Sequence, residues 1–321
     1  MGLTSEFELD AKIQRAEILA SEFPKCPSAQ LALAGLIRLG LNASSISNPE
    51  NLDRCRTLFE TTLSLFPHYP RGVHEFYYYL TDTGDQRAAL ILLFDALKTH
   101  PRSARLWGGL AYPARTGGLL EGAQQALKIR DKLQGSPKTE ARFADNVHLY
   151  SGDLDRYETS LGSGQGQPPN ALLDFYRGYT RLLRGDRVGA QARFKRASED
   201  PASSLLFGKL AHIFLLGMEG RVQEAKAELD GFRDQRRRLR VPDGEFTFKM
   251  AEAYAFLGEY AEAQVVAERA FDQGFACTNW FQSSPLLAPI RTGPRWQSLM
   301  QHVQERQRLL EGRFPAEQFR P

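Results

Sequence analysis

Apolar residues along this chain of 321 residues recur mainly at intervals of three and four positions. This spacing places apolar side chains on one face of an α-helix, and no sustained alternation of apolar and polar residues indicates β-strands. Glycine, proline and aspartate interrupt the periodic segments at short intervals, as residues that begin or end helices do. The pattern predicts an all-α chain of helices roughly 11 to 16 residues long, joined by short turns.

Three stretches share one frame of small residues, aromatic residues and glycine: FTFKMAEAYAFLGEYAEAQVVAERAF, YRGYTRLLRGDRVGAQARFKRASEDP and FYYYLTDTGDQRAALILLFDALKTHP. Gly84, Gly185 and Gly258 hold the same place in the three copies, where a glycine can end a helix in the left-handed conformation. Pro101 and Pro201 close two of the copies, because proline cannot continue a helix. The frame predicts repeated pairs of helices.

Weaker copies fill the intervals between these three. The first helices of the units are predicted to start near residues 28, 70, 102, 138, 171, 204 and 244, with a polar insert at 41–50 and a Gly/Pro-rich turn at 161–170. The spacing stays close to 34 residues, the period of a helix-turn-helix repeat.

These intervals resemble those of the tetratricopeptide repeat (TPR) family. The resemblance implies a TPR-like α-solenoid of about seven helix pairs with capping helices at both ends. Residues 1–27 are then an N-terminal helix or cap, residues 28–275 the repeat array, and residues 276–321 a C-terminal capping segment and helix.

The C-terminal segment WFQSSPLLAPIRTGPRW (280–296) combines aromatic residues, leucines and prolines. It is similar to the end-of-group region that closes many bacterial TPR arrays, although Ser284 and Gly293 stand where that region usually has aspartate. An open end of a repeat array needs an element that is apolar inward and polar outward. We therefore expect Trp280, Leu287 and Trp296 to be largely buried; the alternative is an exposed docking site for a partner.

The resemblance also implies a binding surface, because the first helix of each TPR unit lines a concave groove. Polar side chains beside exposed aromatic ones are suited to binding a protein or peptide segment. No lysine accompanies the groove asparagine as in the TPRs that clamp chaperone tails. The groove residues assigned in this way are Arg71, His74, Tyr78, Arg142, Asn146, Phe175, Tyr179, His212, Phe248 and Glu252.

Charge and cysteine content narrow the class of protein. The net charge is +3, with 25% charged residues of mixed sign, so nothing in the balance indicates a nucleic-acid binder. The arginine run at 232–240 is either a patch for an acidic partner or, as we favour, a solvated helix extension. No secretory signal or membrane span is recognisable, and three scattered cysteines suggest a reducing compartment. We expect a cytoplasmic protein with no membrane or nucleic-acid partner.

The motifs of catalysis and cofactor binding are absent from the sequence. There is no phosphate-binding P-loop, zinc-protease helix, nucleophile elbow or kinase catalytic loop, and GSGQG at 162–166 has no following lysine. The six histidines form no closely spaced ligand pair. We expect no enzyme activity, cofactor or metal.

Three functions remain open at this point. The first is a non-catalytic scaffold that binds a protein segment in its groove. The second is a regulatory region acting with a separate bacterial signalling enzyme, a serine/threonine kinase or a nucleotide cyclase, as the resemblance to bacterial TPR proteins allows. The third, least favoured, is a cryptic enzyme or an RNA-binding helical repeat.

Overall fold

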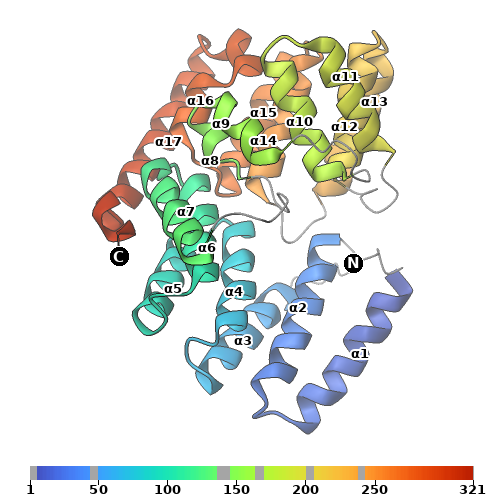
Figure 1. The fold of residues 1–321 in the computed structure, drawn as a ribbon. Coiled ribbons are helices and arrows are strands. Elements are labelled where there is room, and N and C mark those ends of the chain that lie inside the picture. The colour runs from blue at the N-terminus through green and yellow to red at the C-terminus, as the bar shows by residue number, and fades with distance from the viewer. Residues whose placement is uncertain are drawn as a thin grey trace.

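The computed structural model describes residues 6–43, 50–135, 145–162, 170–199, 206–237 and 243–320, and it is all-helical, with no strand in these ranges (Figure 1). In chain order the helices are α1 (Glu6–Glu22), α2 (Pro27–Ala43), α3 (Glu50–Leu65), α4 (Pro70–Asp82), α5 (Gln86–Thr99), α6 (Ala104–Thr116), α7 (Leu120–Gln134), α8 (Val147–Tyr150), α9 (Leu154–Leu161), α10 (Ala171–Leu183), α11 (Arg187–Ser198), α12 (Phe207–Met218), α13 (Val222–Arg236), α14 (Gly244–Phe256), α15 (Tyr260–Asp272), α16 (Thr278–Ser283) and α17 (Pro294–Arg313), with 3₁₀ turns η2 (Pro285–Ile290) and η3 (Ala316–Phe319).

Local sequence explains where many of these helices begin and end. Gly84, Gly185 and Gly258 have φ of +88°, +80° and +82°, so the predicted turn glycines adopt the left-handed conformation. Asp85 and Asp186 follow two of them and accept hydrogen bonds from the backbone N–H groups of Ala88 and Gly189. Such a cap satisfies an N–H group that has no partner within its own helix.

Helix starts agree with most of the predicted unit starts. Helices α2, α4, α6, α10, α12 and α14 begin at Pro27, Pro70, Ala104, Ala171, Phe207 and Gly244. The unit expected near 138 starts outside the described residues, and only the short helices α8 and α9 follow it. Helices that are neighbours in the chain pack on each other, and α4, α6, α10, α12 and α14 also contact helices two places along, as in the pairs α4–α6 and α10–α12.

Buried apolar side chains form two cores. One contains residues between Leu9 and Val147, and the other contains residues between Leu149 and Val303. Helix α17 belongs to both, because Val303 lies in the second core whereas Leu310 lies in the first. The end of the chain therefore ties the two cores together.

The large apolar side chains of the C-terminal segment that we expected to be buried are buried. Trp280, Leu287 and Trp296 are only 2%, 0% and 2% exposed, and η2 packs on α14 and α15. The segment also extends further than an end cap of the last helices, since η3 packs on α7 (Figure 1). There the Phe319 and Phe314 rings lie 5.0 and 5.8 Å from the ring of Phe94 in α5.

A seam joins the α4–α6 region to α14 and the segment after α15. The backbone N–H of Asp243 donates to the carbonyl of Asp82 over 3.2 Å, and that of Ala276 donates to Thr116 over 2.7 Å. At Gly274, where φ is +99°, an added Cβ would lie 2.5 Å from the Cα of Gly84. The two backbones can approach this closely only because both residues are glycine.

No helix within the described ranges is long and apolar enough to cross a membrane.

Replacing Gly274 by alanine is expected to lower the free energy of unfolding by about 2 kcal/mol or more, because left-handed strain and a backbone clash add together. Gly258→Ala is the matched control, since φ there is +82° and nothing lies within 4 Å of an added Cβ. It should lose only about 1 kcal/mol. Urea denaturation of both variants measures the difference, and equal losses would show that the seam is not closely packed at Gly274.

Candidate functional site

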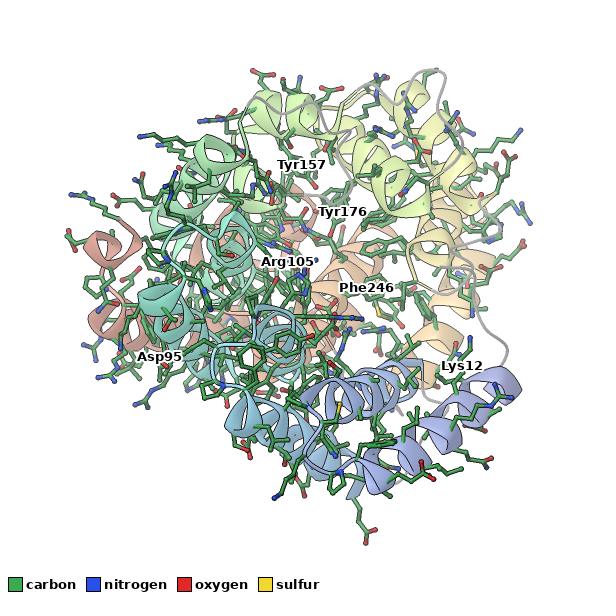
Figure 2. All side chains as sticks on the ribbon, turned by 60° about the horizontal axis from the view of Figure 1, so that its bottom comes forward. Lys12, Asp95, Arg105, Tyr157, Tyr176 and Phe246 are labelled. Atoms are coloured by element: carbon green, nitrogen blue, oxygen red, sulfur yellow. The ribbon has the colours of Figure 1, made fainter. Side chains whose placement is uncertain are left out.

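A cavity of about 1110 Å³, lined by both polar and apolar side chains, lies between helices from distant parts of the chain. Its walls come from α2, α4, α6, α7, α9, α10, α12 and α14. Figure 2 shows Arg105, Tyr176 and Phe246, three of its lining residues, near the centre of the molecule. The cavity therefore gathers side chains that are far apart in the sequence.

One wall of the cavity is aromatic. We call His74, Tyr77, Tyr78 and Tyr112 the aromatic ledge. The Tyr78 ring lies 5.1 Å from His74, 4.7 Å from Tyr77 and 5.5 Å from Tyr112, measured between centroids. The guanidinium of Arg115 lies 4.7 Å from the Tyr112 centroid, a favourable cation–π arrangement. His74 and Tyr78 share one face of α4 because they lie one helical turn apart. The ledge continues onto α6 because α4 packs on α6.

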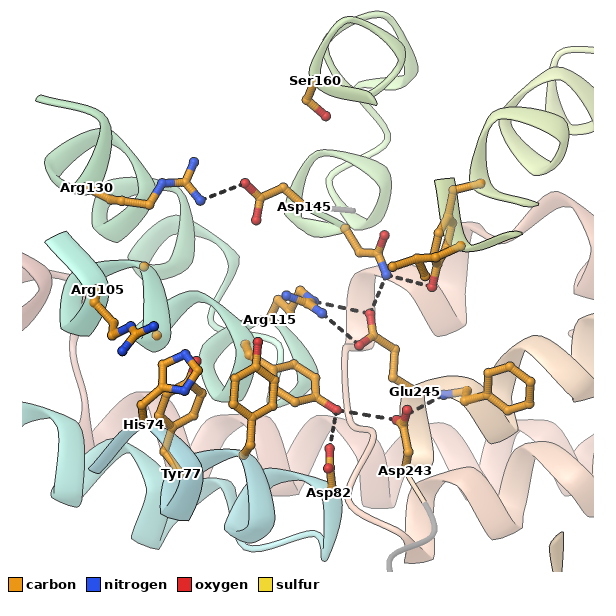
Figure 3. Close-up of a pocket in the computed structure, with 18 of the residues that line it drawn as sticks. His74, Tyr77, Asp82, Arg105, Arg115, Arg130, Asp145, Ser160, Asp243 and Glu245 are labelled. Atoms are coloured by element: carbon orange, nitrogen blue, oxygen red, sulfur yellow. Dashed lines mark hydrogen bonds and ion pairs between the residues drawn. The ribbon is translucent and has the colours of Figure 1, made fainter. Parts of the chain in front are cut away.

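Glu245, in the first turn of α14, is the centre of a buried network. Its carboxylate accepts hydrogen bonds from Arg115 Nε and Nη2 (3.2 and 3.0 Å) and from Asn146 Nδ2 (2.7 Å) (Figure 3). It also accepts one from Tyr150 OH (2.6 Å). Burial alone would raise the pKa of Glu245, but Arg115 and these hydrogen bonds outweigh it, so its pKa lies below the ordinary value. The network holds α6 and α8 against α14.

Asn146 extends this network to two more helices. Its Oδ1 accepts a hydrogen bond from Tyr157 OH (2.5 Å), and its Nδ2 donates to Tyr176 OH (2.8 Å). Burial raises the pKa values of both tyrosines well above the ordinary value, so both stay neutral. Asn146 is thus a structural junction with its polar atoms satisfied.

Two aspartates meet at the floor of the cavity. Tyr112 OH lies 2.7 Å from Asp82 Oδ1 and 3.5 Å from Asp243 Oδ1 (Figure 3). Burial, together with the nearby Asp243 carboxyl, raises the pKa of Asp82 to about 7. Burial, together with Glu245, raises that of Asp243 to about 6.

A second buried ion pair lies in α14. Lys249 Nζ and Glu252 Oε2 are 2.9 Å apart, and both side chains are 0% exposed. Glu252 also accepts hydrogen bonds from Trp280 Nε1 (2.9 Å) and the Ser284 hydroxyl (2.6 Å). The pair therefore anchors the C-terminal segment to α14 and does not line the cavity.

The structure places the sequence-predicted groove residues in three settings. His74, Tyr78 and Asn146 line the cavity. Arg71 is exposed and lies outside its lining, and His212, half-exposed, has its Nδ1 2.9 Å from Glu228. Arg142 lies outside the described residues.

The expectation that Phe175, Tyr179, Phe248 and Glu252 face an open groove is wrong, because all four are buried: Phe175, Tyr179 and Phe248 are 0% exposed, and so is Glu252. Other elements cover these positions. The ring of Phe281, in the C-terminal segment, lies 4.5 Å from that of Phe248. The frame of a single unit cannot show what distant segments will cover.

Several cavity residues were not identified from the sequence: Arg105, Tyr112, Arg115, Asp243 and Glu245. The 34-residue repeat could have identified two of them. Arg105 and Tyr112 stand 34 positions after Arg71 and Tyr78, which the sequence analysis assigned to the groove. Asp243 and Glu245 belong to the cavity only through the long-range seam.

The arginine run does not form one patch. Arg233 pairs with Glu262 at 2.7 Å, and Arg236 is buried with its guanidinium 4.5 Å from the Phe246 centroid. Arg237 is exposed, and residues 238–240 lie outside the described part of the chain. The described arginines thus serve mainly intramolecular contacts.

Among the described residues, no group of three or more His, Cys, Asp or Glu side chains is placed to hold a metal ion. The cavity offers aromatic faces, arginines and hydrogen-bonding groups. Such groups are suited to non-covalent binding.

No family model matches the chain, and no curated protein matches it.

Replacing Glu245 by alanine is expected to destabilise the fold by about 3–5 kcal/mol, because it leaves the buried Arg115 without its partner. Thermal and urea unfolding measure the loss. The exposed pair Arg308–Glu305, 2.7 Å apart, provides the control, and Glu305→Ala should cost less than about 1 kcal/mol. A Glu245→Ala variant as stable as this control would contradict the central role of the network.

Proposed function

We propose that this protein is a non-catalytic interaction module, a TPR-like α-solenoid of about seven helix pairs that binds a protein segment in its cavity. The observation that carries the proposal is the aromatic ledge facing a cavity of about 1110 Å³ with a mixed polar and apolar lining. Small-molecule pockets are typically about 300–1,000 Å³, and this slightly larger space has room for a short peptide segment.

The charges in the cavity indicate where a partner would bind. Arg115 pairs with Glu245 at 3.0 Å, Arg130 with Asp145 at 3.0 Å, and Arg38 with Glu75 at 3.0 Å. Arg105 is exposed and has no ion-pair partner among the described residues. Figure 3 shows it beside His74, above the aromatic ledge.

A segment with an acidic and an apolar side chain fits this wall. The acidic group would pair with the Arg105 guanidinium, and the apolar group would pack on the half-buried rings of Tyr78 and His74. Arginine and tyrosine contribute disproportionately to the binding energy of interfaces. Arg115, Arg130 and Arg38 would keep their structural ion pairs.

Selection from a displayed random-peptide library against the intact chain, followed by affinity measurement with a synthetic selected peptide, tests this proposal. Arg105→Ala and Tyr78→Ala are each expected to weaken binding about tenfold or more, a loss of about 1.4 kcal/mol. Val188→Ala is the control, since Val188 is 82% exposed and lies outside the cavity lining. If the selected peptides bind the Arg105→Ala and Tyr78→Ala variants as tightly as the wild-type protein, they do not bind at this site.

A further inference from the structure

Two carboxyl groups from distant parts of the chain meet across the seam and share one hydroxyl. Asp82 is the last residue of α4, and Asp243 immediately precedes α14. Tyr112 OH lies 2.7 Å from Asp82 Oδ1 and 3.5 Å from Asp243 Oδ1. We call Asp82 and Asp243 the carboxyl pair.

Proton counting shows why this contact favours a bound proton. A tyrosine hydroxyl has a single hydrogen, and its shorter contact directs that hydrogen to Asp82. The Asp243 carboxyl then faces the hydroxyl oxygen, and it gains a hydrogen bond there only if it donates a proton of its own. A proton on either carboxyl also removes the repulsion between two buried like charges.

The backbone holds the pair in place. Asp243 has φ of +53°, unusual for a residue with a Cβ. In this conformation its N–H donates to the Asp82 carbonyl over 3.2 Å, and its Oδ1 accepts from Phe246 N over 3.2 Å. These contacts hold the backbones of Asp82 and Asp243 next to each other.

The surrounding cations do not neutralise the pair. Arg38 from α2 lies 3.9 Å from Asp82 but pairs more closely with Glu75 of α4 at 3.0 Å. Arg115 from α6 is engaged by Glu245 of α14. The other charged group that acts on the pair is Arg236 from α13, which lowers the pKa of Asp243 but does not offset burial and Glu245.

We propose that the carboxyl pair is a pH-sensitive closure at the floor of the cavity, held shut by a proton on one of its two carboxyl groups and loosened when that proton is lost. Both aspartates line the cavity, and they join α4 to the start of α14. Loosening this contact would let α4 and the start of α14 move apart and so open the floor of the cavity to a partner. Only the consequence for partner access rests on the proposed function; the closure itself does not.

The sign of the effect follows from the two pKa values. Both lie above the ordinary value of 3.8, at about 7 for Asp82 and about 6 for Asp243. The closed state therefore binds more protons than an opened state in which both groups face water. Closure weakens as pH rises from about 4 to about 7 and stays weakened above that.

Hydrogen exchange of the seam amides in the intact protein, without any ligand, tests the closure. The reporters are the N–H groups of Asp243 and Ala276, which donate to Asp82 and Thr116. After correction for the intrinsic pH dependence of exchange, both should exchange about tenfold or more faster at pH 8 than at pH 5.5. The Tyr157 N–H, bonded to Asp153 away from the seam, is the internal control.

Asp82→Asn is the matched variant, because an amide keeps the shape, can still accept from Tyr112 OH through its Oδ1, and removes one of the two like charges. In this variant the amide hydrogens of Asp243 and Ala276 should exchange slowly at both pH values. The proposal is overturned if these amides exchange at the same corrected rate at pH 5.5 and pH 8 in the wild-type protein, or if their rates respond to pH equally in Asp82→Asn. If the variant does not fold, carboxyl carbon NMR of the wild-type protein decides: no aspartate titrating above pH 5.5 would overturn it, and one titrating near 6–7 that shifts in Tyr112→Phe would support it.

The two proposals fail separately. If Arg105→Ala abolishes peptide binding but the exchange rates of the seam amides do not depend on pH, the binding site is supported and the closure is refuted. If those exchange rates depend on pH but the selected peptides bind the Arg105→Ala and Tyr78→Ala variants normally, the closure is supported and the binding site is refuted.

Discussion

A carboxylate taken out of water at the start of α14 needs a cation and hydrogen-bond donors, and Glu245 finds them on other segments. Arg115 in α6 supplies the charge, whereas Asn146 and Tyr150 supply further hydrogen bonds. An unpaired buried carboxylate would be strongly destabilising. Helices α6, α8 and α14 must therefore pack together, and the cavity lies beside this contact.

The packing of apolar side chains reinforces the same closure. Helix α17 carries residues of both cores, from Val303 in one to Leu310 in the other. Gly84 and Gly274 let two backbones touch at the seam. The large apolar side chains of the C-terminal segment that we considered as a docking site are thus buried, whereas the aromatic ledge lines the cavity. In our proposal a partner segment binds there, next to the one arginine of the wall that is free of an ion pair among the described residues.

Sequence reasoning predicted the features that depend on local pattern. The all-helical character, most helix starts, the left-handed turns at Gly84, Gly185 and Gly258, and the burial of Trp280 and Trp296 follow from spacing and capping within short segments. Three of the residues that it assigned to a groove, His74, Tyr78 and Asn146, line the cavity, although Asn146 is buried there. It failed at Phe175 and Phe248, because contacts with helices outside their own unit bury both. The pairing of Arg115 with Glu245 joins positions 130 residues apart, and no periodic pattern encodes such a contact.

Closure of the chain on itself is the central claim, and small-angle X-ray scattering of the intact protein tests it most directly. A compact chain of 321 residues has an expected radius of gyration of about 20 Å. The account predicts a value close to that figure and a scattering curve that matches the closed structure. A radius of gyration of about 25 Å or more, well above the value for a compact chain of this length, would show that the two cores separate in solution and would contradict the closed cavity.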